Sequence, residues 1–320
     1  MKLSRKRVYK YIKYSLLSLC LLIFGGAIII YPERYVNCCF QGFAMWAECV
    51  LPSLFPFMII TLIFVKTGIA EKASLPLKRV TGIFKLPPAA GACFLLSVCS
   101  GYPAGSKTLC EFYENGALSS NDCKKLSYLC STSGPLFIIG SVGYKMFGDK
   151  LVGVKILIAH VIAVTVISLL ISLFSKKSQA FQPKRAKADG NVLYNAFYGA
   201  VISVAVAGGF IAFFFVAAQF MQDFNLLYPL KALFNLFLDE STSSAICSGL
   251  IEATGGCRLL AATGDKLAIA LAGFLITFGG VSILLQQLSY LTKAGIKPLK
   301  FIGVKLIQAV LCFTLLLLIA

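Results

Sequence analysis

The sequence predicts an all-α polytopic membrane protein, arranged as an inverted-topology repeat with re-entrant hairpins and discontinuous helices. Hydrophobic residues form 58% of the 320-residue chain and charged residues only 13%. The mean hydropathy is +0.84, and together these values exclude an ordinary soluble domain. Short basic stretches separate the apolar runs, and several apolar runs are interrupted by glycine and proline.

The first interruptions lie in SVCSGYPAGSK, from Ser97 to Lys107, and in STSGPLFIIG, from Ser131 to Gly140. Glycine and proline break the helical hydrogen-bond ladder and leave backbone groups without partners. Lipid cannot satisfy such groups, so broken backbone at membrane depth is tolerated only where protein buries it or where it lines a polar cavity. Two breaks close together in the chain therefore predict a solute site.

The chain is strongly basic, with 30 Lys and Arg against 13 Asp and Glu and a net charge of +17. In a soluble protein this excess would point to nucleic-acid binding. Here the basic residues lie in short runs between apolar segments, as they do in cytoplasmic loops of membrane proteins. We therefore expect the lipid bilayer as a partner, and no nucleic acid.

The sequence contains no pattern typical of an enzyme. It has no GxxxxGK, no HExxH and no serine near a histidine in a nucleophile context. The 12 cysteines show no CxxC or CxxH spacing, so we expect neither a metal site nor a disulfide framework. We predict that the protein is not an enzyme and uses no cofactor.

Residues 1–40 are predicted to form an N-terminal basic segment and a first transmembrane helix. The basic run MKLSRKRVYKYIK precedes an apolar segment from Tyr14 to Tyr31. This segment lacks the small-residue cleavage site of a signal peptide. We expect a retained span with its N-terminus in the cytoplasm.

Residues 41–175 are predicted to form the first repeat. A short amphipathic piece leads into a span kinked by Pro52 and Pro56, which ends near Lys66. The apolar stretch of residues 87–100 covers only about 21 Å as a helix, too short for a hydrocarbon core of about 30 Å. We expect this stretch to enter the membrane and return.

The next helix is predicted to start after the N-cap candidates Ser119, Ser120 and Asn121. It is interrupted at residues 132–135 and ends near Gly148. A further apolar run, residues 151–174, then leads back to the loop of residues 176–190, which is basic and marks the midpoint of the chain.

Residues 191–320 repeat the same order of elements. A long span covers residues 191–220 and a short run covers residues 226–238, after which the chain is expected to break at Gly255 and Gly256. The following helix is interrupted at Gly279 and Gly280, and the last span is expected over residues 298–320.

Orientation follows from counting the crossings. A span, a hairpin, a broken crossing helix and a further span make an odd number of crossings, so the second half must lie upside down relative to the first. The basic loops beginning at Lys66 and Lys176 both fall inside, in agreement with this arrangement. Lys145, Lys150 and Lys155 oppose it, because they surround a predicted outer loop.

Six motifs resemble the sporulation integral membrane proteins of the YlbJ type: LPSLFPF, SGYPAGSK, YENG, STSGPLFIIGSVG, GLIEATGGC and FGGVSILLQQ. These proteins are in turn similar to the nucleoside-recognition or Gate domain of nucleoside transporters. The resemblance runs from Trp46 to the end of the chain. It implies a multi-pass protein of a bacterial cell membrane that is needed for spore formation, in particular for the cortex, and that is built from Gate-like repeats at 41–175 and 191–320.

The candidate substrate-binding residues come from the four interruptions and the motifs beside them. They are Ser100, Gly101, Tyr102, Pro103, Ser131, Thr132, Ser133, Gly134, Glu252, Thr254, Gln286 and Gln287. Small residues at these positions also allow close helix packing, and the glutamines also suit hydrogen bonds between helices. Glu252 either marks an ion path or pairs with Arg258. His160, alone in a long span, is expected to pack between helices rather than relay protons.

Two functions remain open at this point. The first is a secondary transporter that moves a small polar solute, nucleoside-like or cortex-related, by alternating access and coupled to an ion. The second is a membrane scaffold that recruits spore-envelope machinery through its loops.

Overall fold

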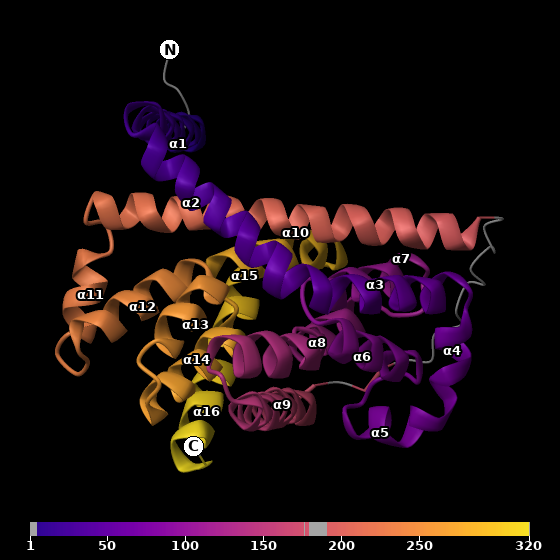
Figure 1. Cartoon of the computed structure of the whole chain (residues 1–320). Coiled ribbons are helices and arrows are strands. Elements are labelled where there is room, and N and C mark those ends of the chain that lie inside the picture. The colour runs from indigo at the N-terminus through magenta and orange to yellow at the C-terminus, as the bar shows by residue number, and fades with distance from the viewer. Residues whose placement is uncertain (1–4, 176, 179–190, 320) are drawn as a thin grey trace.

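The computed structural model describes residues 5–175, 177–178 and 191–319, and within these ranges the chain forms helices and no strand (Figure 1). Helical segments long and apolar enough to cross a membrane are Tyr11–Ile30, Pro32–Lys66, Lys150–Leu173, Val192–Asp223, Lys266–Ala294 and Pro298–Ile319. The prediction of an all-α polytopic membrane protein is confirmed.

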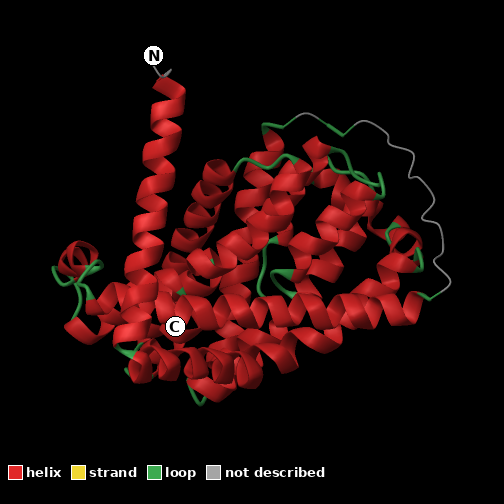
Figure 2. Cartoon of the chain, turned by 90° about the horizontal axis from the view of Figure 1, so that it is seen from above, coloured by secondary structure: helices red, strands yellow, loops and turns green. Residues whose placement is uncertain are grey.

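The first helix, α1 (Arg5–Ile30), stands away from the other helices (Figure 2). Most of its apolar side chains are exposed, as expected of a span that faces lipid. It contacts the rest of the fold near its C-terminal end, where the ring centroid of Phe24 lies 5.7 Å from that of Phe213 and 5.1 Å from that of Phe220 in α10.

Helices α2 (Pro32–Met45) and α3 (Leu51–Lys66) are joined by a π-helical turn, η1 (Trp46–Val50), into one long rod. The rod packs against α10 (Val192–Asp223). The indole of Trp46 donates to the carbonyl of Val204 at 3.0 Å, and Gly42 lies against the backbone of Ala212. The predicted boundary between residues 40 and 41 therefore falls inside α2.

The first hairpin consists of α6 (Ala89–Ser100) and α7 (Ala104–Glu114), which pack against each other and turn at residues 101–103. Short helical segments connect α3 to this hairpin: α4 (Ile69–Ala73), η2 (Leu75–Leu77) and α5 (Lys78–Ile83). The predicted turn in this short apolar stretch is confirmed.

The broken crossing helix of the first half consists of α8 (Ser120–Cys130) and η3 (Phe137–Met146). Ser119 caps α8 through a reciprocal pair of hydrogen bonds with Asp122, the pattern of a capping box. Residues 131–134 between the two parts are not helical, so the predicted interruption is confirmed. Helix α9 (Lys150–Leu173) then completes the half.

The second half repeats this order. Its elements are α10, α11 (Tyr228–Phe234), α12 (Glu240–Ile251), α13 (Ala253–Ala261), α14 (Lys266–Phe278), α15 (Gly280–Leu291), η4 (Thr292–Ala294) and α16 (Pro298–Ile319).

One predicted break is wrong in position. The second hairpin turns at Glu252, where the backbone is extended at φ −135° and ψ 107°, and not at Gly255 and Gly256. The reason is that the Glu252 carboxylate caps α13, whereas the two glycines lie within its first turns. Gly256 serves close packing, because it touches Gly249 of α12 backbone to backbone.

The two hairpins enter from opposite ends of the molecule. Ser120, at the start of α8, donates to the carbonyl of Ala294 at 2.8 Å, and Lys85 donates to the carbonyl of Leu173 at 2.7 Å. The start of α8 and the end of α15 therefore lie at the same end of the molecule. The first hairpin also has its open end there, because only a short turn connects the end of α7 to the start of α8. Helices α14 and α15 together form one span, so the start of α14 lies at the opposite end of the molecule from the end of α15. The second hairpin is connected to the start of α14 by a short turn, so its open end lies at that opposite end. This arrangement is the predicted inverted repeat.

We predict that Gly256→Ala destabilises the second hairpin. A Cβ at position 256 would lie 2.3 Å from the Cα of Gly249, which is backbone and cannot move aside. The expected loss is about 1–3 kcal/mol, measured by thermal unfolding of the purified protein in detergent. The matched control is Gly303→Ala in α16, where nothing lies within 4 Å. Equal melting temperatures for the two variants would contradict the tight packing.

Candidate functional site

The four backbone breaks meet in pairs. A Cβ at Gly101, where φ is +70°, would lie 2.5 Å from the amide nitrogen of Gly134, so the tip of the first hairpin touches the first broken helix directly. A Cβ at Gly280, where φ is +62°, would lie 2.9 Å from the carbonyl of Gly249 and 3.3 Å from the amide nitrogen of Ala253. Only glycine allows such backbone contact at positive φ.

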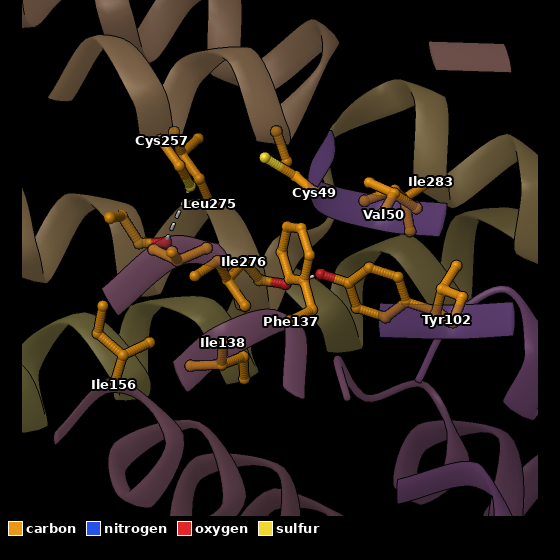
Figure 3. Close-up of a cluster of buried hydrophobic side chains, with 14 of the residues drawn as sticks. Cys49, Val50, Tyr102, Phe137, Ile138, Ile156, Cys257, Leu275, Ile276 and Ile283 are labelled. Carbon is orange, nitrogen blue, oxygen red and sulfur yellow. Dashed lines mark hydrogen bonds between the residues drawn. The ribbon is translucent and has the colours of Figure 1, made fainter. Parts of the chain in front are cut away.

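Hydrogen bonds then join the two pairs across the halves. The hydroxyl of Tyr102, at the tip of the first hairpin, donates to the carbonyl of Ile276 in α14 at 2.5 Å, and Figure 3 shows this bond beside the ring of Phe137. The hydroxyl of Ser131 donates to the side-chain carbonyl of Gln287, and Ser106 donates to the same oxygen at 3.3 Å. The breaks therefore form one connected centre.

His160 holds the first broken helix in place. Its Nε2 accepts from the backbone N–H of Ser133 at 3.2 Å. Because an N–H can only donate, the ring proton must reside on Nδ1, which faces the hydroxyl of Thr277 at 2.9 Å. His160 is fully buried and acts as a neutral bridge between α9, the break and α14, in agreement with the packing role expected of it.

Helix α16 supplies two further buried donors. Lys305 is fully buried and donates from Nζ to the carbonyl of Ser131 at 2.8 Å. Gln308, also fully buried, donates to the carbonyl of Tyr128 at 3.0 Å. These two carbonyls belong to the last turn of α8 and the break, where the intrahelical donors are missing. A cation at this end of a helix is also favoured by the helix dipole.

Three buried polar atoms near the centre have no hydrogen-bond partner within the described part of the chain. They are Nε2 of Gln287, Oε1 of Gln308 and the hydroxyl of Thr132. Buried polar atoms are normally satisfied by protein, water or a ligand. The centre therefore has spare hydrogen-bonding capacity.

The centre encloses a small cavity of about 30 Å³. Its lining draws on both hairpins and both broken helices and includes Tyr102, Pro103, Ser133, Gly134, Thr254 and Gln286. This volume holds about one water molecule. The conformation described here is therefore closed around its centre, and a solute the size of a nucleoside does not fit between the breaks.

A larger cavity of about 510 Å³ lies beside the second hairpin. We call it the Glu252 cavity, and its polar lining consists of Gln41, Gln219, Gln222, Ser248, Glu252 and Arg258. The Glu252 side chain is buried, and its carboxylate accepts from the backbone N–H groups of Thr254 at 3.1 Å and Gly255 at 2.7 Å. No ion pair joins Glu252 to Arg258, so the alternative of a Glu252–Arg258 pair is wrong for this conformation.

The structure places the twelve predicted site residues differently. Six line the central cavity as given above, while Gly101, Ser131 and Gln287 hold the breaks together. Glu252 lies in the other cavity. Ser100 donates back to the carbonyl of Leu96 at 2.6 Å, within its own helix. Thr132 is buried at the break without a bond.

Several residues of the centre were missed by sequence reasoning: Ser106, Thr277, Lys305 and Gln308. The signal that marks Lys305 and Gln308 is present in the sequence. Each is an isolated polar residue in the apolar helix PLKFIGVKLIQAVLCFTLLLLI, and polar side chains inside a span face the protein interior.

The geometry defines the class of protein: a multi-pass α-helical membrane protein whose two inverted halves meet through broken helices at a shared polar centre. Among curated proteins, the chain is similar to the sporulation integral membrane protein YlbJ of Bacillus subtilis (strain 168). The two are 24% identical over 319 residues, which cover 90% of this chain and 78% of the relative. The resemblance to the YlbJ type is confirmed, and it supports a sporulation-associated membrane protein. No family model matches the chain, and no solved structure matches it significantly.

We predict that Lys305→Ala lowers the free energy of unfolding by about 2–4 kcal/mol, because it removes a buried stem and a donor to the break. Lys305→Met keeps most of the volume and avoids burying a charge, so its loss should be smaller by about 1 kcal/mol or more. Thermal unfolding in detergent measures both. A Lys305→Ala variant as stable as the parent would contradict the role of the Nζ bond to Ser131.

Proposed function

We propose that the protein is a secondary transporter that moves a small polar solute across the cell membrane of a spore-forming bacterium by alternating access. One observation carries the proposal: two hairpins entering from opposite ends, and two broken helices, converge on one polar centre. Inverted repeats with discontinuous helices that meet at midplane are the architecture of many secondary transporters.

The centre has the properties of a gate. The contacts that close it, from Tyr102 to Ile276 and from Ser131 to Gln287, all join one half to the other. Moving one hairpin tip away from its partner half breaks few bonds and exposes the unpaired amide of Gln287. A solute that pairs with this amide would offset the lost contacts, which is the differential binding that a conformational change requires.

The partners of this proposed transporter are the bilayer, the solute and a coupling ion. Nucleoside-like or cortex-related solutes match the resemblance to Gate-domain proteins. We propose that the N-terminus lies in the cytoplasm. The end of the molecule where Lys85, Lys125 and the start of α8 meet then faces inward, as the positive-inside rule favours.

A second function, a scaffold for spore-envelope assembly, has one observation in its favour. The central cavity of about 30 Å³ is too small for an organic solute in this conformation. A scaffold needs no water-filled pathway for a solute and would act through its surface loops instead.

We predict that a Tyr102→Phe, Gln286→Ala double variant loses transport-dependent function. Losing one or two hydrogen bonds at the centre costs about 1–3 kcal/mol, which corresponds to a loss of about tenfold or more in the affinity for the solute. The measurement is spore yield in the native host, with the amount of protein in the membrane followed by immunoblot.

The matched control changes the exposed basic side chains Lys72, Lys78 and Arg79 to glutamine. A transporter should tolerate this loop variant and lose spore yield in the centre variant at normal membrane levels. The opposite pattern, in which the loop variant loses spore yield and the centre variant does not, would overturn the transporter in favour of the scaffold.

A further inference from the structure

The Glu252 cavity is separate from the central cavity and far larger. At about 510 Å³ it falls within the usual range for small-molecule pockets, roughly 300–1,000 Å³. Its walls come from α2, α10 and the second hairpin. The apolar residues Met45, Phe215 and Leu259 line part of it, so it combines apolar walls with a few convergent polar groups, as ligand pockets do.

Glu252 gives the cavity a buried negative end. Its side chain is only 2% exposed, and each of its two carboxylate oxygens accepts a hydrogen bond from one N-terminal amide of α13, which stabilises the charge. Within the described residues no basic side chain pairs with it. A buried carboxylate without a cation is costly, so a positive group that enters the cavity is favoured there.

Arg258 gives the same cavity a positive group near the other end of α13. Its side chain is exposed and forms no ion pair with any described residue. Six positions separate it from Glu252, about 9 Å along the helix axis. The cavity therefore presents a negative and a positive group at two separated points.

Two amide side chains of α10, Gln219 and Gln222, also line the cavity. Gln222 donates to Ser248 at 2.5 Å, and Gln219 donates to Asp223 at 2.7 Å. The side-chain carbonyl oxygens of both glutamines make no bond to the described residues and remain available as acceptors. They suit the N–H groups of a peptide bond or a side-chain amide.

We propose that the Glu252 cavity binds a small zwitterion of the amino-acid or dipeptide class. The ammonium of the ligand lies against the carboxylate of Glu252 and its carboxylate faces the guanidinium of Arg258. The inference rests on the proposed transport function and deepens it by naming the solute class. Because Thr254 lines the central cavity and Glu252 lines this one, the hairpin turn separates an entry site from the gate.

The test uses the purified full-length protein in detergent, with isothermal titration and thermal shift. The probes are L-glutamine, L-alanine, L-alanyl-L-alanine, uridine, glucose, methylamine and acetate, each in sodium chloride and in choline chloride. We expect binding and a raised melting temperature with one or more of the zwitterions, and none with uridine or glucose. Methylamine and acetate alone should bind far more weakly, because each satisfies only one end.

Three variants locate the site. Glu252→Gln should abolish zwitterion binding. Arg258→Ala changes an exposed side chain, so it should fold normally and weaken binding by about tenfold. Lys231→Ala, which removes an exposed ion pair with Glu240 outside the cavity, should bind as the parent does.

The outcomes separate this inference from the proposed function. Binding of uridine or glucose with no zwitterion binding would overturn the solute class and leave the transporter intact. Stabilisation by sodium alone that depends on Glu252 would overturn it in favour of an ion site. Zwitterion binding unaffected by Arg258→Ala would overturn the placement in this cavity. No binding by any probe would overturn the solute class as well, and the Tyr102 and Gln286 variants would then decide the transporter separately.

Discussion

The structure depends on one constraint: backbone groups exposed by a helix break at membrane depth must be satisfied by protein. The carbonyl of Ser131 accepts a hydrogen bond from Lys305, and the carbonyl of Ile276 accepts one from Tyr102. The backbone N–H of Ser133 donates one to His160. Each partner comes from another element of the fold. The breaks can therefore form only when these helices have assembled around them.

Because of this constraint, each half supplies hydrogen-bond donors to backbone groups of the other half. Lys305 belongs to the second half and satisfies a break in the first, whereas Tyr102 belongs to the first and satisfies a carbonyl in the second. Gly101 and Gly134 are in close backbone contact, so no side chain at these two positions could satisfy the exposed backbone groups instead. The polar centre is thus a structural joint, and any movement of a hairpin tip must exchange these bonds for others.

Much of this arrangement follows from the sequence, because apolar runs and their Gly and Pro interruptions are local signals. The crossing spans, the turn after Ser100 and the breaks at residues 131–134 and at Gly279 are all of this kind. The position of the second hairpin turn is not, since a pair of glycines is a stronger breaking pattern than a single glutamate. The turn lies at Glu252 because its carboxylate caps α13 by accepting hydrogen bonds from the amides of Thr254 and Gly255.

Residues such as Lys305 and Thr277 could not be assigned to the site from local pattern, because their roles depend on which helices become neighbours. Hydropathy over a window treats α16 as a uniform apolar span despite Lys305 and Gln308. The better guide is the cost of burying a polar group: an isolated lysine in a span must face a partner inside the protein. Applied to every span, this argument would have linked α16 to a break, although not to Ser131 in particular.

Under the proposed transport function, the sizes of the two cavities fit a single working cycle. A transporter must at some stage close its centre to both sides, and a gap of about 30 Å³ between the breaks is what such a stage requires. Under the same proposal, the space for a solute lies beside the centre, where the Glu252 cavity of about 510 Å³ borders the tip of the second hairpin. Glu252 caps the helix that forms one side of this tip and also faces the cavity. Under this proposal, a cation bound at its carboxylate would act directly on the start of α13, which the same carboxylate caps. Occupancy of the cavity and the position of the hairpin tip would then be coupled through one side chain.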